Sequence, residues 1–342
     1  MVKRNQINVG VIGVGIQGER HLRVYLESPF VKKIAVSDID EMKLKRVSEV
    51  YKIRSVYTDY VEMLENEELD LVSVATPDFA HKDPTIEALR RGVNVIVEKP
   101  LATSVKDAED MVNEAKKRKL LLFTNFFNRW NPPFALAKEK VEKGELGDPV
   151  YAYIRLSDTL YVPTKMLSWA TRSNVVYFLM SHTADLVRWI FSDEVVRVRA
   201  WGFNKVLKNL GINTFDYVIA VLEFKEGEKA VLESAWILPE SMPCVVDFKF
   251  EIIGSKGAIN IDARSQGIEV MSLKYEYPRY LVFSNIHGSI FGAVKESLNH
   301  AIKCFIHKEK PLVNTLDGLI NVKILCSILE SIKKGTDVQL KL

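Results

Sequence analysis

The sequence has few cysteines, and their spacing suggests no pairing. Its three cysteines, Cys244, Cys304 and Cys326, are odd in number and form no C-x-x-C pair. Cys304 and Cys326 fall in apolar helical patterns, which favours buried free thiols and a reducing, cytoplasmic location. The six histidines are dispersed and no H-E-x-x-H is present, so the sequence shows no metal site.

Two further absences narrow the class of partner. The formal net charge is only +3, and the lysines and arginines are scattered along the chain, which argues against nucleic acid and membrane surfaces as partners. No apolar stretch is long enough for a membrane span. The apolar run within residues 1–15 leads directly into a glycine-rich turn, so we interpret it as a first strand and not as a signal peptide.

Residues 1–126 alternate short β-rich runs with helical patterns. The β-rich runs are Ile7–Ile12, Lys33–Asp38, Leu71–Ala75, Val93–Val97 and Leu120–Asn125, with a short strand and helix near Ser55–Leu64. The helical patterns are Glu19–Glu27, Glu41–Tyr51, Asp83–Arg91 and Val105–Lys117. This alternation predicts an α/β domain over residues 1–126, a doubly wound parallel sheet with helices on both faces.

The pattern changes after Asn131-Pro132-Pro133, and strands then dominate. Helices are predicted at Pro133–Lys143, Val176–Phe191, Ile290–His307 and Leu316–Lys334. Strands are predicted at Val150–Leu156, Val195–Val206, Phe215–Phe224, Lys229–Leu238, Val245–Ile253, Ala258–Asp262 and Ile268–Tyr275. Consecutive strands joined by short turns favour a second, α+β domain over residues 127–342, with a large mixed or antiparallel sheet.

The strand predicted at Phe215–Phe224 is apolar on both of its faces. Tyr217, Ile219 and Val221 alternate with Val218, Ala220 and Leu222. A sheet that is apolar on both faces must be covered twice, and the few helices of this half can cover one face. The other face is expected to meet another subunit, in a homodimer or homotetramer.

A glycine-rich turn follows the first predicted strand. Gly13-Val14-Gly15-Ile16-Gln17-Gly18 is a G-x-G-x-x-G that opens the helix from Glu19, the context of a Rossmann dinucleotide-binding unit. Gly13 permits the tight turn, Gly15 lets the backbone approach a pyrophosphate, and Gly18 lets the helix pack on the strand. The N-terminus of the helix then offers N–H groups and a positive dipole end to the phosphates.

Asp38 ends the second predicted strand, twenty residues beyond Gly18. A carboxylate here accepts hydrogen bonds from the adenosine ribose and repels a 2′-phosphate, and the next residue is Ile39 in place of an arginine. Both features favour NAD over NADP. The alternative is that Asp38 is a helix N-cap, a role that Asp40 could take instead.

Two further strand ends are expected to face the same ligand, because ligands bind at the carboxyl ends of parallel strands. Ala75-Thr76-Pro77 with His81 ends the fourth strand, and Glu98-Lys99-Pro100 ends the fifth. Their residues Ala75, Thr76, Pro77, His81, Glu98 and Lys99 are predicted cofactor contacts. The alternative for each segment is an ordinary strand-to-helix turn that contains a proline.

Together these segments resemble the Gfo/Idh/MocA oxidoreductase family, which includes glucose–fructose oxidoreductase and inositol dehydrogenase. The resemblance rests on the glycine turn, Ala75–His81, Glu98-Lys99-Pro100-Leu101 and His182-x-x-Asp185-x-x-x-Trp189, and it spans nearly the whole chain. It implies a C-terminal domain with a large open sheet and a substrate pocket facing the nicotinamide. It further implies that Lys99 is the active-site lysine, that His182 is the acid/base, and that the Lys99–Pro100 peptide is cis.

The chemistry suits these implied roles. A carbinol carbon releases hydride only as its hydroxyl loses a proton, which an imidazole can take near neutral pH. An ammonium beside the oxygen stabilises the developing alkoxide. The alternative for His182 is a packed helix histidine in simple contact with Asp185.

The sequence departs from the family beside the histidine. Family members carry an aspartate four residues earlier, whereas this chain has Phe178. Without that carboxylate the imidazolium is less stabilised and the tautomer less fixed. Asp158 or Asp185 could substitute, and Tyr177 is a further candidate base.

The resemblance also implies substrate contacts in four regions, at Asn128, Arg129, Trp169 and Arg172, with His182. Arg129, Arg155 and Arg172 could hold a carboxylate or phosphate on a sugar, although each could equally be a surface charge. The resulting prediction is an NAD-dependent dehydrogenase of a sugar, sugar acid or cyclitol hydroxyl. The alternatives are a non-catalytic NAD-binding regulator and an NAD-dependent glycoside hydrolase.

Overall fold

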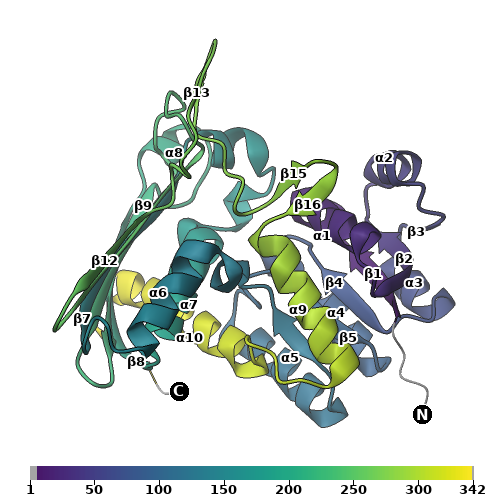
Figure 1. Ribbon diagram of the computed structural model, residues 1–342, viewed down its shortest axis with the longest axis horizontal. Coiled ribbons are helices and arrows are strands. Elements are labelled where there is room, and N and C mark those ends of the chain that lie inside the picture. Colours follow the sequence, from purple (N-terminus) through teal and green to yellow (C-terminus); the bar gives the residue numbers. More distant parts are fainter. Residues whose placement is uncertain (1–5, 341–342) are drawn as a thin grey trace. The chain divides into compact units, whose positions relative to one another are not determined.

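The computed structural model describes residues 6–340 and divides the chain into two compact units (Figure 1). The first contains the chain up to Phe127 together with Val282–Leu319, and the second contains Asn128–Leu281 together with the chain from Ile320 onward. The sequence analysis placed a single boundary after residue 126, so the division differs at residues 282–319. The apolar stripe of a helix shows that the helix packs, but not on which unit.

The first unit is built on a six-stranded sheet in the order β3-β2-β1-β4-β5-β6, in which every pairing is parallel. The strands are β1 (Ile7–Ile12), β2 (Val31–Ser37), β3 (Ser55–Tyr57), β4 (Leu71–Val74), β5 (Asn94–Val97) and β6 (Leu122–Thr124). Strand order reverses between β1 and β4, and ligands bind at the carboxyl ends of strands beside such a reversal. The predicted doubly wound parallel sheet is confirmed.

Helices connect these strands. They are α1 (Ile16–Glu27), α2 (Glu41–Tyr51), α3 (Tyr60–Asn66), α4 (Lys82–Arg90) and α5 (Val105–Arg118), and α9 (Ala293–His307) joins them from late in the chain and packs on α1. All four residues of β4 and all four of β5 are buried. These strands are therefore mostly apolar along their length, because helices cover both faces of the sheet.

The second unit is built on a seven-stranded sheet in the order β12-β11-β7-β10-β9-β8-β17. The strands are β7 (Pro149–Asp158), β8 (Val195–Phe203), β9 (Tyr217–Phe224), β10 (Lys229–Ala235), β11 (Val246–Gly254), β12 (Ala258–Asp262) and β17 (Val338–Gln339). Only the pairing of β7 with β10 is parallel, so the sheet is mixed, as predicted. The carboxyl ends of β7 and β10 therefore lie side by side.

One face of this sheet is covered by helices. Figure 1 shows α6 (Pro132–Glu142) and α7 (Ser181–Phe191) on the same side of the strands. The residues of β9 alternate, with Val218, Ala220 and Leu222 buried in the core and Tyr217, Ile219 and Val221 only half-buried on the opposite face. The long α10 (Thr315–Lys334) precedes the last strand, β17. None of the helices within residues 6–340 is both long and apolar enough to cross a bilayer.

Several predicted elements differ from the structure. The strand predicted at Ile268–Tyr275 is a small hairpin of β13 (Val270–Met271) and β14 (Tyr275–Glu276), separate from the main sheet, and its side chains are exposed. The helix predicted from Ile290 begins at Ala293, because Ser289–Phe291 forms β16, which pairs with β15 (Ser284–Ile286). An alternating apolar pattern predicts that a segment is a strand, but it does not predict which sheet the strand joins.

The strand predicted at Val195–Val206 ends early for a local reason. The buried Asp216 carboxylate accepts the backbone N–H groups of Lys205, Val206 and Leu207 at 2.6–2.8 Å. These contacts end β8 at Phe203 and begin the short helix α8 (Val206–Asn209). A side-chain acceptor thus replaces the strand ladder as the partner of these N–H groups.

Candidate active site

The glycine turn lies between β1 and α1, and its three glycines have different surroundings. Gly13 has φ +88°, and a Cβ there would come within 2.9 Å of the Ala75 backbone. A Cβ on Gly18 would overlap the carbonyl oxygen of Gly13, whereas a Cβ on Gly15 would have no atom of the described chain within 4 Å. Gly13 and Gly18 therefore serve the close packing of the turn, and Gly15 leaves room for a ligand against the backbone.

The N-terminus of α1 is suited to bind phosphate. Gly15 occupies the N-cap and supplies no side-chain cap, and the Ile16 side chain at the first helical position is exposed. Backbone N–H groups of Ile16, Gln17 and Gly18 form the first turn. A pyrophosphate oxygen would accept hydrogen bonds from such a turn at the positive end of the helix dipole.

Asp38 is fixed beside this turn. Its Oδ2 accepts the N–H of Val14 at 2.8 Å and its Oδ1 accepts the N–H of Asp40 at 3.0 Å. The N-cap of α2 is Asp40, which accepts the N–H groups of Met42 and Lys43, so the N-cap alternative for Asp38 is wrong. Ile39 is 93% exposed. Asp38 therefore presents a carboxylate, without a basic neighbour in sequence, beside the glycine turn.

The loop after β4 packs on the glycine turn. The N–H of Ala75 donates to the carbonyl of Ile12 at 2.8 Å, and the Thr76 hydroxyl donates to the carbonyl of Ala80 at 3.1 Å. His81, beyond Pro77, is buried, with Nδ1 2.8 Å from the carbonyl oxygen of Pro100 and Nε2 3.0 Å from that of Thr76. Burial lowers the pKa of His81. The imidazole of His81 therefore links the loops after β4 and β5.

Glu98 and Lys99 follow β5, and the Lys99–Pro100 peptide is cis. Glu98 is buried, with Oε1 2.9 Å from Nε2 of His21 and 2.7 Å from Nδ2 of Asn125, while Oε2 accepts the Lys99 N–H at 3.3 Å. Burial by itself would raise the pKa of Glu98, but the His21 and Asn125 contacts and the Lys99 charge bring it below its usual value. Glu98 was predicted to contact the cofactor. Its carboxylate instead contacts His21, Asn125 and the backbone N–H of Lys99.

A residue from late in the chain completes this buried cluster. The Ser297 hydroxyl on α9 donates to Oδ1 of Asn125 at 2.7 Å. His21, Asn125 and Ser297 are fully buried. The sequence analysis missed all three. His21 could have been found as a polar residue on the apolar face of α1, but nothing in the sequence places Ser297 near Asn125.

In the second unit, His182 lies in the first turn of α7. Its Nδ1 is 3.2 Å from Nδ2 of Asn128, a residue of the 3₁₀ turn Phe127–Trp130. The Oδ1 of Asn128 accepts from Nδ2 of Asn131 at 3.3 Å. Asn128, predicted to contact substrate, therefore contacts the predicted acid/base, and Asn131 is a further residue that the sequence analysis missed.

The remaining predicted charges have partners or lie elsewhere. Arg129 and Asp185 form a buried two-point ion pair, with N–O distances of 2.6 and 3.0 Å, and the Arg129 guanidinium lies over the Trp189 ring. Arg155 pairs with Asp247 at 2.8 Å, and Arg172 is exposed at the end of the 3₁₀ turn Ala170–Arg172. Asp185 is thus held by Arg129, which weakens its case as the substitute for the missing carboxylate.

Phe178 belongs to an aromatic group. Its ring centroid lies 6.1 Å from that of Trp169 and 5.6 Å from that of Trp236, which follows β10. The segment Val176–Met180 is π-helical, and α-helical geometry begins at Ser181. The first turn of the helix predicted at Val176–Phe191 is therefore π-helical, so α-helical spacing does not run unbroken from Phe178 to His182.

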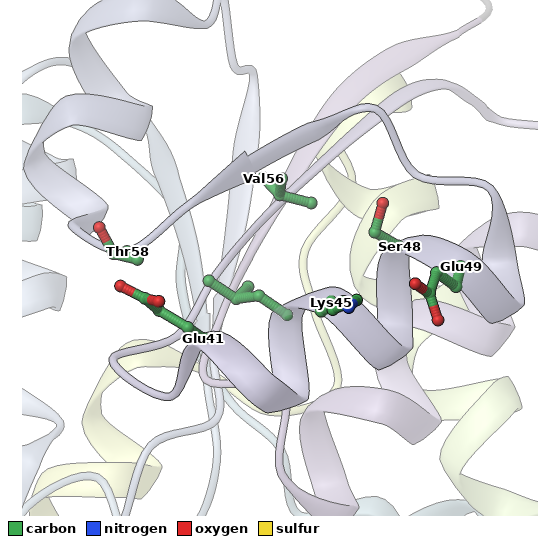
Figure 2. Close-up of a pocket in the computed structure, with 7 residues that line it drawn as sticks. Glu41, Lys45, Ser48, Glu49, Val56 and Thr58 are labelled. Atoms are coloured by element: carbon green, nitrogen blue, oxygen red, sulfur yellow. The ribbon is translucent and has the colours of Figure 1, made fainter.

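A hollow lies between α2 and β3. Figure 2 shows Glu41, Lys45, Ser48 and Glu49 of α2 on one side of it and Val56 and Thr58 on the other. None of the predicted site residues lines it. We therefore do not assign it to the active site.

Known proteins resemble both halves of the chain. A family model described as an oxidoreductase family with an NAD-binding Rossmann fold matches residues 7–126, and the GFO/IDH/MocA C-terminal domain matches residues 134–260. The scyllo-inositol 2-dehydrogenase (NAD(+)) of Bacillus subtilis is 25% identical over 98% of this chain and 97% of its own length. The myo-inositol 2-dehydrogenase of Thermotoga maritima is 27% identical over 98% of this chain and 99% of its own.

Solved structures share the fold. The scyllo-inositol dehydrogenase of Lactobacillus casei with bound NAD(H) and scyllo-inositol has a TM-score of 0.82 at 20% identity, covering 98% of this chain and 99% of that one. GenD2 from gentamicin A biosynthesis, in complex with NAD, has a TM-score of 0.88 at 20% identity, covering 100% and 98%.

Proposed function

The chain belongs to the GFO/IDH/MocA family of NAD-binding oxidoreductases, and on that premise we propose that it oxidises or reduces a hydroxyl-bearing carbon of a cyclitol, sugar or sugar acid. The observation that carries the proposal is the first unit itself, where an open glycine turn, Asp38 and Lys99 follow the carboxyl ends of β1, β2 and β5 of one parallel sheet. The relatives named above are inositol dehydrogenases, so a cyclitol is the substrate that we would test first. Neither alternative, the regulator or the glycoside hydrolase, finds support among them.

The residues of the first unit fit NAD. Gly15 and the first turn of α1 would hold the pyrophosphate, and the Asp38 carboxylate would accept the ribose hydroxyls and repel a 2′-phosphate. Bound NAD supplies the hydride acceptor or donor. Ala75, Thr76 and Pro77 would line the same end of the sheet, and Glu98 would act through Lys99 without touching the cofactor.

Two side chains would act on the substrate. The Lys99 ammonium would stabilise negative charge that develops on the substrate oxygen as the carbon is oxidised, and the adjacent Glu98 carboxylate favours that ammonium in its charged form. The His182 imidazole would take the hydroxyl proton, or return it in the reverse direction. Trp169 and Arg172 stay as proposed substrate contacts, and Arg129 is no longer proposed because Asp185 occupies it.

The second unit would also form a homodimer or homotetramer, through the face of its sheet opposite α6 and α7. On that face Ile219, Val221 and Val231 are half-buried, and Trp201 and Phe203 are each 50% exposed. The charged Arg199, Glu223 and Glu233 lie among these side chains on the same face. Exposed large apolar side chains with charged neighbours are common at subunit interfaces. We also propose a cytoplasmic location, because Cys244, Cys304 and Cys326 form no disulfide within residues 6–340.

The proposed function is tested by a screen of NAD reduction with myo- and scyllo-inositol, monosaccharides, sugar acids and sugar phosphates, followed as NADH absorbance. We expect turnover with at least one cyclitol or sugar and accumulation of free NADH. His182→Gln and Lys99→Ala serve as the variants that must lose it. Tight NAD binding without turnover on the whole panel would contradict the proposal and favour the regulator.

A further inference from the structure

Arg279 is an arginine of the second unit whose charge has no direct partner. Several other arginines of this unit form ion pairs with acidic side chains, namely Arg129, Arg155, Arg188, Arg197 and Arg264. The guanidinium of Arg279 forms no hydrogen bond or ion pair with residues 6–340, and its Nε is buried. An arginine stays charged at neutral pH, so Arg279 carries a positive charge that no contact within these residues neutralises.

The backbone on both sides of Arg279 is fixed by hydrogen bonds. The N–H of Tyr277 donates to the carbonyl of Pro243 at 2.8 Å, and the N–H of Leu281 donates to Oε1 of Gln266 at 2.9 Å. The chain is therefore held two residues before and two residues after Arg279. A side chain on such a fixed segment can hold a ligand group in a defined position.

This segment lies near the carboxyl end of β7. Tyr277 is bound to Pro243, three residues before β11 begins at Val246, and Val246 pairs with Asp158, the last residue of β7. Burial lowers the pKa of the Arg279 guanidinium, and the negative charge of Asp158 opposes this lowering. The two side chains are thus electrostatic neighbours, although they form no ion pair with each other.

The proposed substrate contacts of the second unit lie at the same end of the sheet. Strand β10 runs parallel beside β7, and Trp236 follows its last residue. The rings of Trp236 and Trp169 both pack on Phe178, which precedes the proposed acid/base His182 by four residues. Arg279 therefore stands at the strand ends that carry these aromatic side chains.

The terminal amino groups of Arg279 are accessible to a ligand. The residue is half-buried as a whole, and Nε is the only one of its guanidinium nitrogens that is fully enclosed by residues 6–340. A carboxylate accepts parallel N–H···O bonds from a guanidinium and neutralises its charge, whereas a sugar hydroxyl leaves the charge uncompensated. A phosphate would bring up to two negative charges close to Asp158, which disfavours it.

We propose that Arg279 binds a carboxylate of the substrate, so that the enzyme acts on a sugar acid in preference to an uncharged sugar or cyclitol. The inference rests on the proposed function and narrows its substrate class. The substrate carboxylate would form the ion pair that Arg279 does not make with residues 6–340. The hydroxyl that is oxidised would belong to another carbon of the same molecule.

Pairs of substrates that differ only in charge test the proposal with the full-length protein and NAD. Glucose is compared with glucuronate and with glucose 6-phosphate, and galactose with galacturonate, by NADH absorbance. We expect kcat/KM for at least one acid to exceed that of its neutral partner by about tenfold or more, as for a hydrogen bond to a charged group. Arg279→Met should abolish this preference by lowering kcat/KM for the acid, and should leave the neutral sugar within several-fold.

Arg264→Met is the matched control. It removes a positive charge from the same part of the chain, but from an arginine that is already paired with Asp262. It should keep the preference for the acid. If it removed the preference as completely as Arg279→Met, the effect would come from the overall charge of the region, and the assignment to Arg279 would be wrong.

The melting temperature gives a readout that does not depend on turnover. With NAD present, the preferred acid should raise the melting temperature of the unaltered protein and should not raise that of Arg279→Met, because a ligand stabilises only the protein that binds it. Without ligand, Arg279→Met should melt no lower than the unaltered protein, because the variant removes a half-buried charge that has no direct partner. A lower melting temperature would show that Arg279 has a structural role instead.

The outcomes distinguish this inference from the proposed function. If neutral substrates are turned over and no acid has an advantage, or if Arg279→Met keeps the advantage, the role of Arg279 is overturned while the dehydrogenase function stands. A preference for glucose 6-phosphate over both acids would overturn the choice of a carboxylate. If no substrate is turned over, the proposed function fails, and the melting experiment alone decides whether Arg279 binds a sugar acid.

Discussion

Lys99 is the residue whose chemistry is most sharply defined by its neighbours. Its backbone N–H faces the Glu98 carboxylate, and its side chain is nearly buried. We expect Lys99→Ala to lower turnover by roughly a hundredfold or more, as for the loss of a donor to a developing oxyanion. NAD affinity, measured by fluorescence titration, should stay within several-fold. Lys82→Ala is the control, since Lys82 lies in the same unit and forms ion pairs with Asp107 and Asp110. A near-normal kcat in Lys99→Ala would show that Lys99 takes no part in the reaction.

Asp38 and Asp40 form a matched pair for cofactor choice. Asp38 lies beside the glycine turn through its contact with Val14, whereas Asp40 caps α2. We expect Asp38→Ala to narrow the preference for NAD over NADP, because the repulsion of a 2′-phosphate is lost. Asp40→Ala should instead lower the melting temperature, because the N-cap of α2 is lost, and leave the preference for NAD intact. Titration of each variant with NAD and with NADP measures this preference. Tighter binding of NADP than of NAD by the unaltered protein would contradict the prediction.

Glu98 makes the free energy of unfolding depend on pH in the acidic range. Its pKa in the folded state is below the unfolded value of about 4.3, so its contribution is fully present above that unfolded pKa and is lost as the pH falls through the lowered folded pKa. Urea unfolding at a series of pH values should therefore show a steeper loss of unfolding free energy below about pH 5 in the unaltered protein than in Glu98→Gln. The exposed Glu49→Gln should keep the native slope, and equal slopes in all three proteins would refute the prediction.

At the scale of the element, two glycines of the β1–α1 turn have different roles: Gly18 is required for packing, and Gly15 leaves room for the ligand. A methyl group on Gly18 would overlap the Gly13 carbonyl, while one on Gly15 would meet open space. We expect Gly18→Ala to lower the melting temperature by several degrees, and Gly15→Ala to melt like the unaltered protein but to bind NAD at least tenfold more weakly. Calorimetry and cofactor titration measure the two effects. Normal NAD binding by Gly15→Ala would show that the pyrophosphate does not approach there.

The sequence predicts an element correctly where nearby residues determine its structure. It does not where a residue distant in sequence determines where the element ends or what it packs on. The glycine turn, β4 and β5 follow from apolar runs, glycines and their order along the chain. The early end of β8 depends on Asp216, which is ten or more residues away from the N–H groups of Lys205 and Val206. The 268–275 segment has apolar residues at strand-like positions, such as Met271 and Leu273, yet these side chains are exposed on a hairpin.

At the scale of the whole molecule, the face of the second sheet opposite α6 and α7 predicts self-association. Light scattering at micromolar concentration should give at least twice the 39.0 kDa of one chain. Val221→Glu, at the half-buried centre of that face, should weaken the association, because it places a charge in an apolar interface. Leu273→Glu, on the exposed hairpin, is the matched control. A single 39.0 kDa species in the unaltered protein would count against the interface.

The site follows the same division between local and distant determinants. Lys99, Asp38 and His182 could be singled out because each occupies a fixed place in a pattern. The network that supports Lys99 joins residues 77 and 172 positions apart, His21 to Glu98 and Asn125 to Ser297, and no pattern in the sequence records such contacts. The substitute for the missing aspartate was sought among carboxylates, whereas the residue that meets His182 is an amide.

The late return of the chain to the first unit sets an order for biosynthesis. All six strands of the parallel sheet have left the ribosome once residue 124 has emerged, but α9, whose Ser297 completes the buried cluster around Asn125, is made about 170 residues later. During that interval α1 lacks the helix that packs on it. We therefore expect the nascent N-terminal unit to stay accessible to chaperones and proteases until the second unit has been translated, and to complete the buried cluster around Asn125 only when α9 has emerged.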